Sequence, residues 1–154
     1  MFICNWAQTI NMSFNCGKFQ HMRYGPLHND QAKYMSPDHQ IILTESQVKD
    51  LGILTSSGGD FGAQIEEKSK KSKQISGWIL QTFKTREAQP MIILFKSLVL
   101  PILEYCCQLW SPDKLGLMRK LESVQRNLTS EISGLGQLNY WKRLRKLRMY
   151  SLEI

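Results

Sequence analysis

Apolar residues recur at three- and four-residue spacing from Ile65 almost to the end of the chain, and this period constrains the fold more than any other feature. It matches the spacing of residues on one face of an α-helix. Three stripes are present: Ile65, Ser69, Ser72, Ile75, Trp78, Ile79 and Phe83; Leu117, Leu121, Val124, Leu128 and Ile132; and Leu138, Trp141, Leu144, Leu147 (or Arg148) and Leu152. We therefore expect three amphipathic helices in a bundle.

A fourth helix is predicted within the most apolar stretch, residues 91–110. This stretch is long enough to cross a bilayer, but Lys96, Pro101 and Glu104 lie inside it. A helix that is buried in a core and kinked or broken at Pro101 is the better interpretation. We expect the following Ser-Pro-Asp motif to end this helix, with Asp113 capping the next one.

The first part of the chain lacks the helical period and consists of short runs separated by turn-forming residues. We expect a helix ending within residues 5–12, strands at residues 12–15 and 19–24, a loop over residues 25–39, and a hairpin between residues 41–43 and 48–54. Asp60 is the predicted N-cap of the first long helix. The sequence predicts an α+β protein that is mostly α, with one domain over residues 1–58 and a helical domain over residues 59–154.

The net positive charge is confined to the helical part. Residues 1–64 hold four Lys/Arg and five Asp/Glu, a net charge of −1, whereas residues 65–154 hold sixteen Lys/Arg and eight Asp/Glu, a net charge of +8. A basic surface of this kind attracts polyanions such as nucleic acid, and a solvated surface without a partner is the alternative. Trp78, Trp110 and Trp141 are candidates for base stacking, but their helical spacing among aliphatic residues favours core packing.

The cysteines indicate a reducing compartment. Cys4, Cys16, Cys106 and Cys107 form no Cys-x-x-Cys pair, and the apolar start of the chain is too short for a secretion signal. We expect free thiols, a cytoplasmic or nuclear protein that is not secreted, and no metal site.

Several motifs together resemble one protein family. In the first part they are Trp6, NMSFN at residues 11–15, KF at 18–19, RYG at 23–25 and VKDLGIL at 48–54. In the helical part they are GWIL at residues 77–80, FKTR at 83–86, KSLVLPILEYC at 96–106, WSP at 110–112, LESVQR at 121–126 and YWKRL at 140–144. In this order and spacing they resemble the end of the palm and the thumb of reverse transcriptases from non-LTR, LINE-type (jockey-like) retrotransposons.

The resemblance implies both a fold and an activity. The implied fold has short palm-derived strands, a hairpin at residues 48–54 that grips the primer terminus, and a basic, thumb-like helical bundle. The complete family enzyme is an RNA-directed DNA polymerase that transfers nucleotides with two Mg²⁺ ions held by palm aspartates. This sequence contains no Asp-Asp or Asp-x-Asp pair. We therefore expect no cofactor in this chain and no polymerase activity from it alone.

The resemblance also assigns roles to individual residues. Lys18 matches the family's lysine beside the leaving pyrophosphate, and a surface lysine after a turn is the alternative. Leu51 and Gly52 match the primer grip, and a bend in an edge strand is the alternative. The expected nucleic-acid contacts are Lys68, Lys70, Lys71, Lys73, Lys142, Arg143, Arg145, Lys146 and Arg148. A solvated helix face or, for the second group, a nuclear-localisation-like run is the alternative.

The expected function is that of a reverse transcriptase fragment that binds an RNA–DNA hybrid or other nucleic acid weakly and without sequence preference. Its partners then include the missing fingers and palm of the parent polymerase. The alternatives are a degenerate retrotransposon-derived product and a helical module that binds an acidic protein. Because the palm strands lack partner strands, we expect marginal stability and an exposed apolar edge near Met12 and Phe14.

Overall fold

The computed structural model describes residues 2–25, 33–112 and 114–152. The chain divides into two compact units, Met1–Asp60 and Phe61–Ile154, which are described separately. About 54% of the chain is helical and 11% is strand, so the predicted α+β class with a majority of helix is confirmed.

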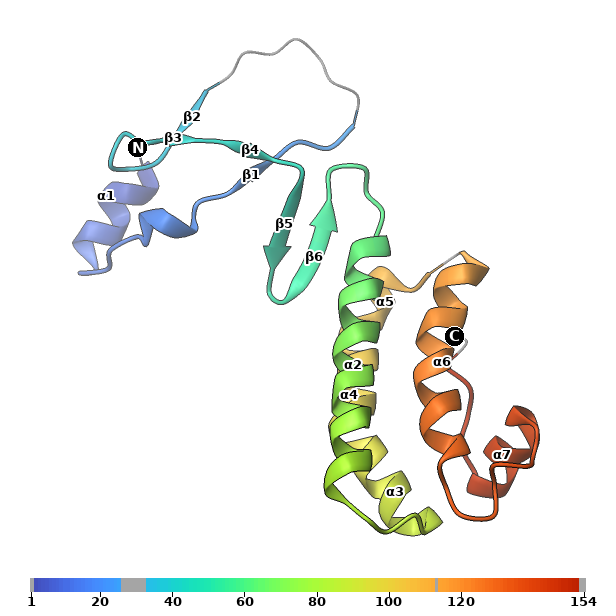
Figure 1. The fold of residues 1–154 in the computed structure, drawn as a ribbon. Coiled ribbons are helices and arrows are strands. Elements are labelled where there is room, and N and C mark those ends of the chain that lie inside the picture. Colours follow the sequence, from blue (N-terminus) through green and yellow to red (C-terminus); the bar gives the residue numbers. More distant parts are fainter. Residues whose placement is uncertain (1, 26–32, 113, 153–154) are drawn as a thin grey trace. The chain divides into compact units, whose positions relative to one another are not determined.

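The N-terminal unit combines one helix and one 3₁₀ turn with short strands (Figure 1). Its described elements are α1 (Phe2–Thr9), η1 (Cys16–Lys18), β1 (His21–Met22), β2 (Tyr34–Met35), β3 (Ile41–Ile42), β4 (Thr44–Glu45), β5 (Gln47–Asp50) and β6 (Ile53–Ser56). The strands form three separate pairs: β1 with β4 in parallel, and β2 with β3 and β5 with β6 antiparallel. Each ladder among the described residues is therefore short, and the parallel β1–β4 pair joins segments that are distant in the sequence.

The predicted pairing of residues 41–43 with residues 48–54 is wrong. β3 pairs with β2, and the second run folds back on itself as the β5–β6 hairpin. Leu51 and Gly52 form its two-residue turn, with φ of 46° and 82°. Positive φ at both positions suits the right-handed twist of paired strands. The periodicity suggested one strand because Leu is an uncommon residue at the first turn position, where Asn or Asp is the usual signal.

Local side-chain hydrogen bonding also replaces the strand that the sequence predicts at residues 12–15. Asn11 has φ of 55°, and α1 ends two residues before it. The Asn15 side chain accepts a hydrogen bond from the Gly17 amide at 3.2 Å and begins η1. Asn residues favour such turns over extended backbone, which explains the wrong prediction.

Two further predictions for this unit are corrected. The strand expected over residues 19–24 is reduced to β1, His21–Met22. The loop expected over residues 25–39 contains β2, and its residues 26–32 lie outside the described part of the chain.

Few side chains of the N-terminal unit are buried. Among its described residues, only Ala7 and Ile53 are buried apolar side chains. The exposed large apolar side chains are Ile3, Trp6, Ile10, Met12, Phe14, Phe19, Tyr24, Tyr34, Met35, Ile41, Leu43 and Leu51. The expected exposure near Met12 and Phe14 is confirmed and extends over most of the unit. The described part of this unit therefore has almost no apolar core.

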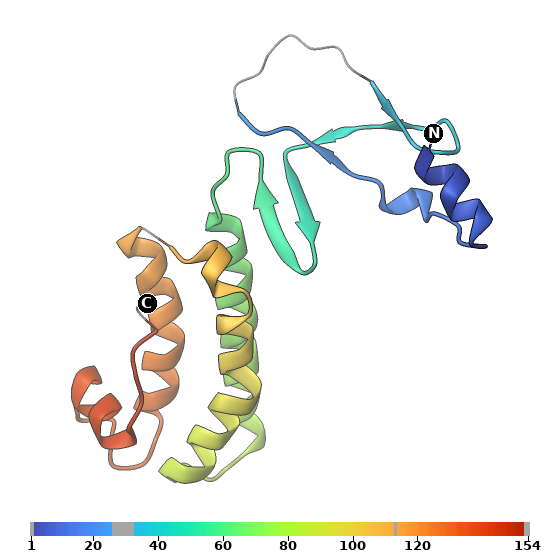
Figure 2. The same ribbon diagram turned by 180° about the vertical axis from the view of Figure 1, so that it is seen from behind.

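The C-terminal unit is helical. Its described elements are α2 (Gly62–Thr82), α3 (Ala88–Leu94), a π-helical turn η2 (Phe95–Val99), α4 (Leu100–Glu104), α5 (Cys107–Trp110), α6 (Leu115–Ser130) and α7 (Tyr140–Leu147). α6 lies beside α2, and the run from α3 to α4 returns antiparallel along α2 (Figures 1 and 2). α7 packs against α6. Within the described residues, no helix combines the length and apolar character that crossing a membrane requires.

The helical run continues through Pro101, where the sequence predicts a kink or break. The π turn η2 ends at Val99, two residues before Pro101, and the Leu100 amide that follows it donates to the Phe95 carbonyl. Such a turn widens the backbone where proline removes a donor and crowds the preceding turn. The actual break follows at Cys106, which adopts a left-handed conformation with φ of 54°.

The apolar stripes of α2 and α6 differ in how well the sequence predicts them. Leu121, Val124, Leu128 and Ile132 are buried as expected. On α2 the buried face consists of Gln64, Ile65, Ser69, Ser72, Ser76 and Ile79. Trp78, a member of the predicted stripe, is 53% exposed. Small serine side chains allow neighbouring helices to approach α2 closely, and a tryptophan on that face would prevent this approach.

The last helix is shorter than predicted and rotated about its axis. Its buried residues are Tyr140, Arg143, Leu144 and Leu147. Trp110 is buried as expected, whereas Trp141 is 55% exposed, so the core assignment of Trp141 is wrong, as it is for Trp78. The side chain of Asn139 caps α7 by accepting a hydrogen bond from the Lys142 amide at 2.9 Å. Arg148 in the left-handed region ends the helix.

The predicted caps of α2 and α6 are not observed. The N-cap of α2 is Phe61, and the preceding Asp60 carboxylate instead accepts a hydrogen bond from the Ser56 hydroxyl at 2.9 Å. Asp113, the predicted cap of α6, lies outside the described residues.

Candidate nucleic-acid interface

A hollow in the N-terminal unit brings together two of the residues that the resemblance singles out. It has a volume of about 910 Å³. Its lining residues are Gly17, Lys18, Gln20, Met22, Tyr24, Val48, Lys49, Asp50, Leu51 and Thr55. Lys18, expected beside the nucleotide, and Leu51, expected at the primer, thus line one concave surface. Gly52 completes the turn that carries Leu51.

Local structure explains why these side chains face the hollow. The Asn15-capped turn η1 presents Lys18 at its last position. The β5–β6 turn carries Leu51, which is 82% exposed. Lys49 of β5, to which the sequence assigned no role, also lines the hollow. Two ammonium groups around an open hollow can bind a phosphate group.

The hollow does not fit the pair of Mg²⁺ ions of the complete family enzyme. Two such ions about 4 Å apart require several clustered carboxylates. Asp50 supplies the one carboxylate among the lining residues. No group of three or more His, Cys, Asp or Glu residues suited to a metal ion occurs in the described part of the chain. The described residues can hold an anion but offer no two-metal centre.

A second basic surface lies in a shallow groove between α2 and α6 of the C-terminal unit. The groove has a volume of about 610 Å³. Its lining residues are Glu66, Ser69, Lys70, Lys73, Gln74 and Lys120. Lys120 forms an ion pair with Glu66. The hydrogen bond from Lys120 and its positive charge lower the pKa of the Glu66 carboxyl. The groove therefore holds three cations, one of which is already paired.

The four lysines that the sequence groups on α2 occupy different surroundings. Lys70 and Lys73 line the groove with Lys120, whereas Lys71 is exposed outside its lining. Lys68 is half-buried, and its Nζ lies 5.5 Å from the centroid of the Tyr105 ring. The sequence did not indicate Lys120, because its proximity to α2 depends on how α6 packs against α2.

The third basic surface is the outer face of α7. Lys142, Arg145, Lys146 and Arg148 are exposed, as expected. The prediction that Arg143 shares this face is wrong, because Arg143 is only 6% exposed. The Arg143 guanidinium donates to the Arg126 carbonyl at 3.3 Å and lies 5.8 Å from the centroid of the Tyr140 ring.

A buried hydrogen-bond network holds α7 in this orientation on α6. The Tyr140 hydroxyl donates to the Glu122 carboxylate and accepts from Gln125 Nε2 at 3.0 Å. Gln125 Nε2 also lies 2.8 Å from the Tyr150 carbonyl, and the other Glu122 oxygen accepts from the Leu152 amide at 2.8 Å. Burial, followed by the Glu122 carboxylate, raises the pKa of Tyr140. Tyr140 thus remains a neutral hydrogen-bond donor.

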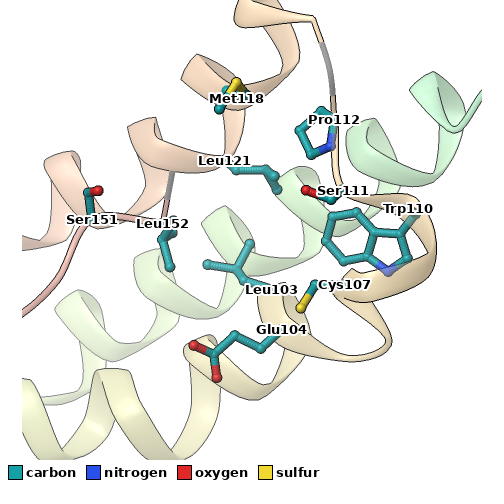
Figure 3. Close-up of a pocket in the computed structure, with 10 residues that line it drawn as sticks. All are labelled: Leu103, Glu104, Cys107, Trp110, Ser111, Pro112, Met118, Leu121, Ser151 and Leu152. Carbon is teal, nitrogen blue, oxygen red and sulfur yellow. The ribbon is translucent and has the colours of Figure 1, made fainter. Parts of the chain in front are cut away.

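A small cavity in the same unit is too small and too apolar to bind nucleic acid (Figure 3). Its volume is about 60 Å³, and Leu103, Trp110, Leu121 and Leu152 approach it from different segments. We attribute it to imperfect packing where the C-terminal segment covers the bundle.

No family model matches the chain, and no curated protein or solved structure is significantly similar to it. The candidate interface is therefore defined by its own residues: the hollow around Lys18, the α2–α6 groove and the outer face of α7.

Proposed function

We propose that this protein is a non-catalytic, nucleic-acid-binding part of a non-LTR retrotransposon-type reverse transcriptase. Its ligand is an RNA–DNA hybrid or a related primer–template duplex. The observation that carries the proposal is the hollow that Lys18 and Leu51 both line. The resemblance assigns one of these residues to the nucleotide and the other to the primer terminus, so their presence on one surface supports it.

The charge distribution supports the same proposal. The helical unit carries the net positive charge of the chain, and seven of its exposed cations line the α2–α6 groove or lie on α7 and at its end. Contacts between such cations and backbone phosphates carry no sequence information. Binding is therefore sequence-independent and weakens with salt as counterions are released.

Under this proposal, catalysis belongs to residues in another part of the polymerase. The hollow offers Asp50 alone as a carboxylate, so the two Mg²⁺ ions belong to another part of the polymerase. The exposed apolar side chains of the N-terminal unit provide a surface against which the fingers and palm can pack.

A salt titration of RNA–DNA hybrid binding tests the proposal. The double charge reversal Lys18→Glu/Lys49→Glu is expected to weaken binding at least about tenfold and to reduce the log–log salt slope by about two. Lys33→Glu is the matched control, because Lys33 is an exposed cation of the same unit outside the hollow. The proposal fails if the unmodified protein does not bind the hybrid at low salt. An equal effect of Lys33→Glu would show that the hollow is not the contact surface.

A helical module that binds an acidic protein remains the second candidate. The basic groove and the outer face of α7 favour it, because both suit any extended polyanion. Competition for a labelled RNA–DNA hybrid distinguishes the two candidates. If the protein binds acidic proteins, poly-glutamate should displace the labelled hybrid as effectively as unlabelled hybrid of equal charge does. If it binds nucleic acid, poly-glutamate should compete less effectively.

A further inference from the structure

Trp141 is a large aromatic side chain on an otherwise cationic helix face. It is 55% exposed, and the other exposed residues of α7 are cations. On an α-helix, positions 141 and 145 lie on the same side one turn apart. Lys142 adjoins them, and Arg148 follows at the end of the helix. α7 itself contains no acidic residue.

The exposure of Trp141 follows from the rotational setting of α7 and not from fraying of its end. The Asn139 cap fixes the first turn, and the hydroxyl of Tyr140 is held by Glu122 and Gln125. With Tyr140 anchored and Leu144 buried one turn later, the intervening backbone directs Trp141 outward.

The exposed ring of Trp141 packs against a buried aromatic neighbour. The rings of Tyr140 and Trp141 have centroids 5.3 Å apart at an interplanar angle of 55°. The guanidinium of Arg126, an exposed residue of α6, lies 4.5 Å from the Tyr140 centroid. Arg126 thus contacts the buried Tyr140 ring, which in turn contacts the exposed ring of Trp141.

We propose that Trp141 stacks on an unpaired base of a single-stranded nucleic acid, while Lys142, Arg145 and Arg148 contact the flanking phosphates. An exposed aromatic ring amid cations is the arrangement that single-strand binding uses, because every base has a face for stacking. The inference rests on the proposed function in that the ligand is nucleic acid. It adds a base contact and an unpaired segment, which duplex binding does not require.

Trp78 provides an internal comparison. It is 53% exposed, nearly the same fraction as Trp141. Its ring meets Phe83 edge-on, with centroids 6.2 Å apart. The residues one turn away on α2, at positions 74, 75, 81 and 82, carry no charge. Exposure alone is thus common to both tryptophans, and the cationic surroundings distinguish Trp141.

The test uses the full chain and two oligonucleotides of equal length, oligo(dT) and an abasic strand with the same number of phosphates. Trp141→Ala is expected to weaken oligo(dT) binding at least about fivefold at fixed salt and to leave abasic-strand binding and the salt slope unchanged. Trp78→Ala is expected to affect neither ligand. Trp141→Phe keeps a ring that can stack, so it should retain most of the oligo(dT) affinity.

Three results would overturn the inference: equal losses on both strands, an equal loss for Trp78→Ala, or full affinity of Trp141→Ala for oligo(dT). A parallel loss of poly-glutamate binding in Trp141→Ala would identify a docking surface for an acidic protein instead. The proposed function fails separately, through absent hybrid binding by the unmodified protein. Duplex binding without any effect of Trp141→Ala would leave that function standing and remove only the base contact.

Discussion

At the scale of single residues, helix phase and not residue type decides the role of each cation on α7. Arg143 and Arg145 are two positions apart, yet Arg143 is buried under Tyr140 and Arg145 is exposed. The guanidinium of Arg143 binds the Arg126 carbonyl, which compensates part of the cost of removing it from water. Arg143 therefore orients α7, and its exposed neighbours are the candidate phosphate contacts.

Tyr140→Phe tests the network beneath α7. Removing the hydroxyl leaves Glu122, a buried carboxylate, without one of its donors, so the free energy of unfolding should fall by about 1–3 kcal/mol in urea denaturation. Tyr150→Phe is the control, because the Tyr150 side chain is exposed and its change should lie within about 0.5 kcal/mol. Equal effects of the two substitutions would contradict the network.

The same tyrosine predicts a pH dependence. Its pKa is raised in the folded protein above the ordinary value of about 10, so the unfolded state loses this proton first. The stability that Tyr140 contributes is therefore present below pH 10 and falls as the pH rises above it. Denaturation at rising pH should show this loss in the unmodified protein and less of it in Tyr140→Phe.

At the scale of secondary-structure elements, the packing of α2 against α6 creates a surface that neither helix has alone. α2 carries Lys70 and Lys73, and α6 adds Lys120 across the groove. The pairing of Glu66 with Lys120 limits the positive charge that the groove presents to a ligand. Glu66 therefore opposes phosphate binding while it joins the two helices.

Glu66→Gln should release Lys120 for phosphate contact and tighten RNA–DNA hybrid binding by roughly threefold, with a salt slope steeper by about one. Glu131→Gln, which removes an exposed charge outside the groove lining, is the matched control and should change little. The pKa of Glu66 is lowered, so its carboxylate stays charged until the pH falls below the ordinary range of glutamate. Below that pH the unmodified protein should bind like Glu66→Gln. Tightening by both variants would point to net charge alone.

At the scale of the whole molecule, the two units differ in how much apolar surface they bury. Among the described residues, fifteen apolar side chains are buried in the C-terminal unit and two in the N-terminal unit. Hydrophobic burial is the dominant favourable contribution to folding, so the two units should differ strongly in stability. We therefore expect the helical unit to be the more stable of the two.

Calorimetry of the full chain should therefore show a cooperative transition of the helical unit and a separate, weaker one at lower temperature. Hydrogen exchange should protect the amides of α2 and α6 and leave residues 12–24 nearly unprotected. A single sharp transition accompanied by uniform protection would contradict this difference between the units.

Much of the helical unit could be predicted from the sequence, because its information is local. The stripe from Leu121 to Ile132 repeats at helical spacing, and any packing partner requires that face to be buried. The N-terminal unit was harder because its strands are short and its turns depend on single residues. Asn15 and Leu51 change the direction of the chain, and neither alters the apolar period enough to reveal it.

The candidate site residues also divide into those that the sequence predicts and those that only the tertiary structure brings to a site. The exposed cations of α7 followed from the charge run alone, apart from Arg143. Lys49 and Lys120 did not, because each joins its site only where separate elements come together: η1 and β5 at the hollow, and α2 and α6 at the groove. Trp141 was assigned to the core because an aromatic residue among leucines fits an apolar stripe. The buried face of α7 keeps Leu144 and Leu147 of that stripe but contains Tyr140 in place of Trp141.

By itself, the sequence determined that this protein is mostly helical, that its net positive charge lies in the helical part, and that the sequence contains no paired aspartates. These properties depend on composition and on spacing along one chain segment. Only the tertiary structure decided that Lys18 and Leu51 line one hollow, that Lys120 faces α2, and that Trp141 is exposed. The physical reason is that each depends on the register or rotation of one element against another, which distant side chains determine through packing and buried hydrogen bonds.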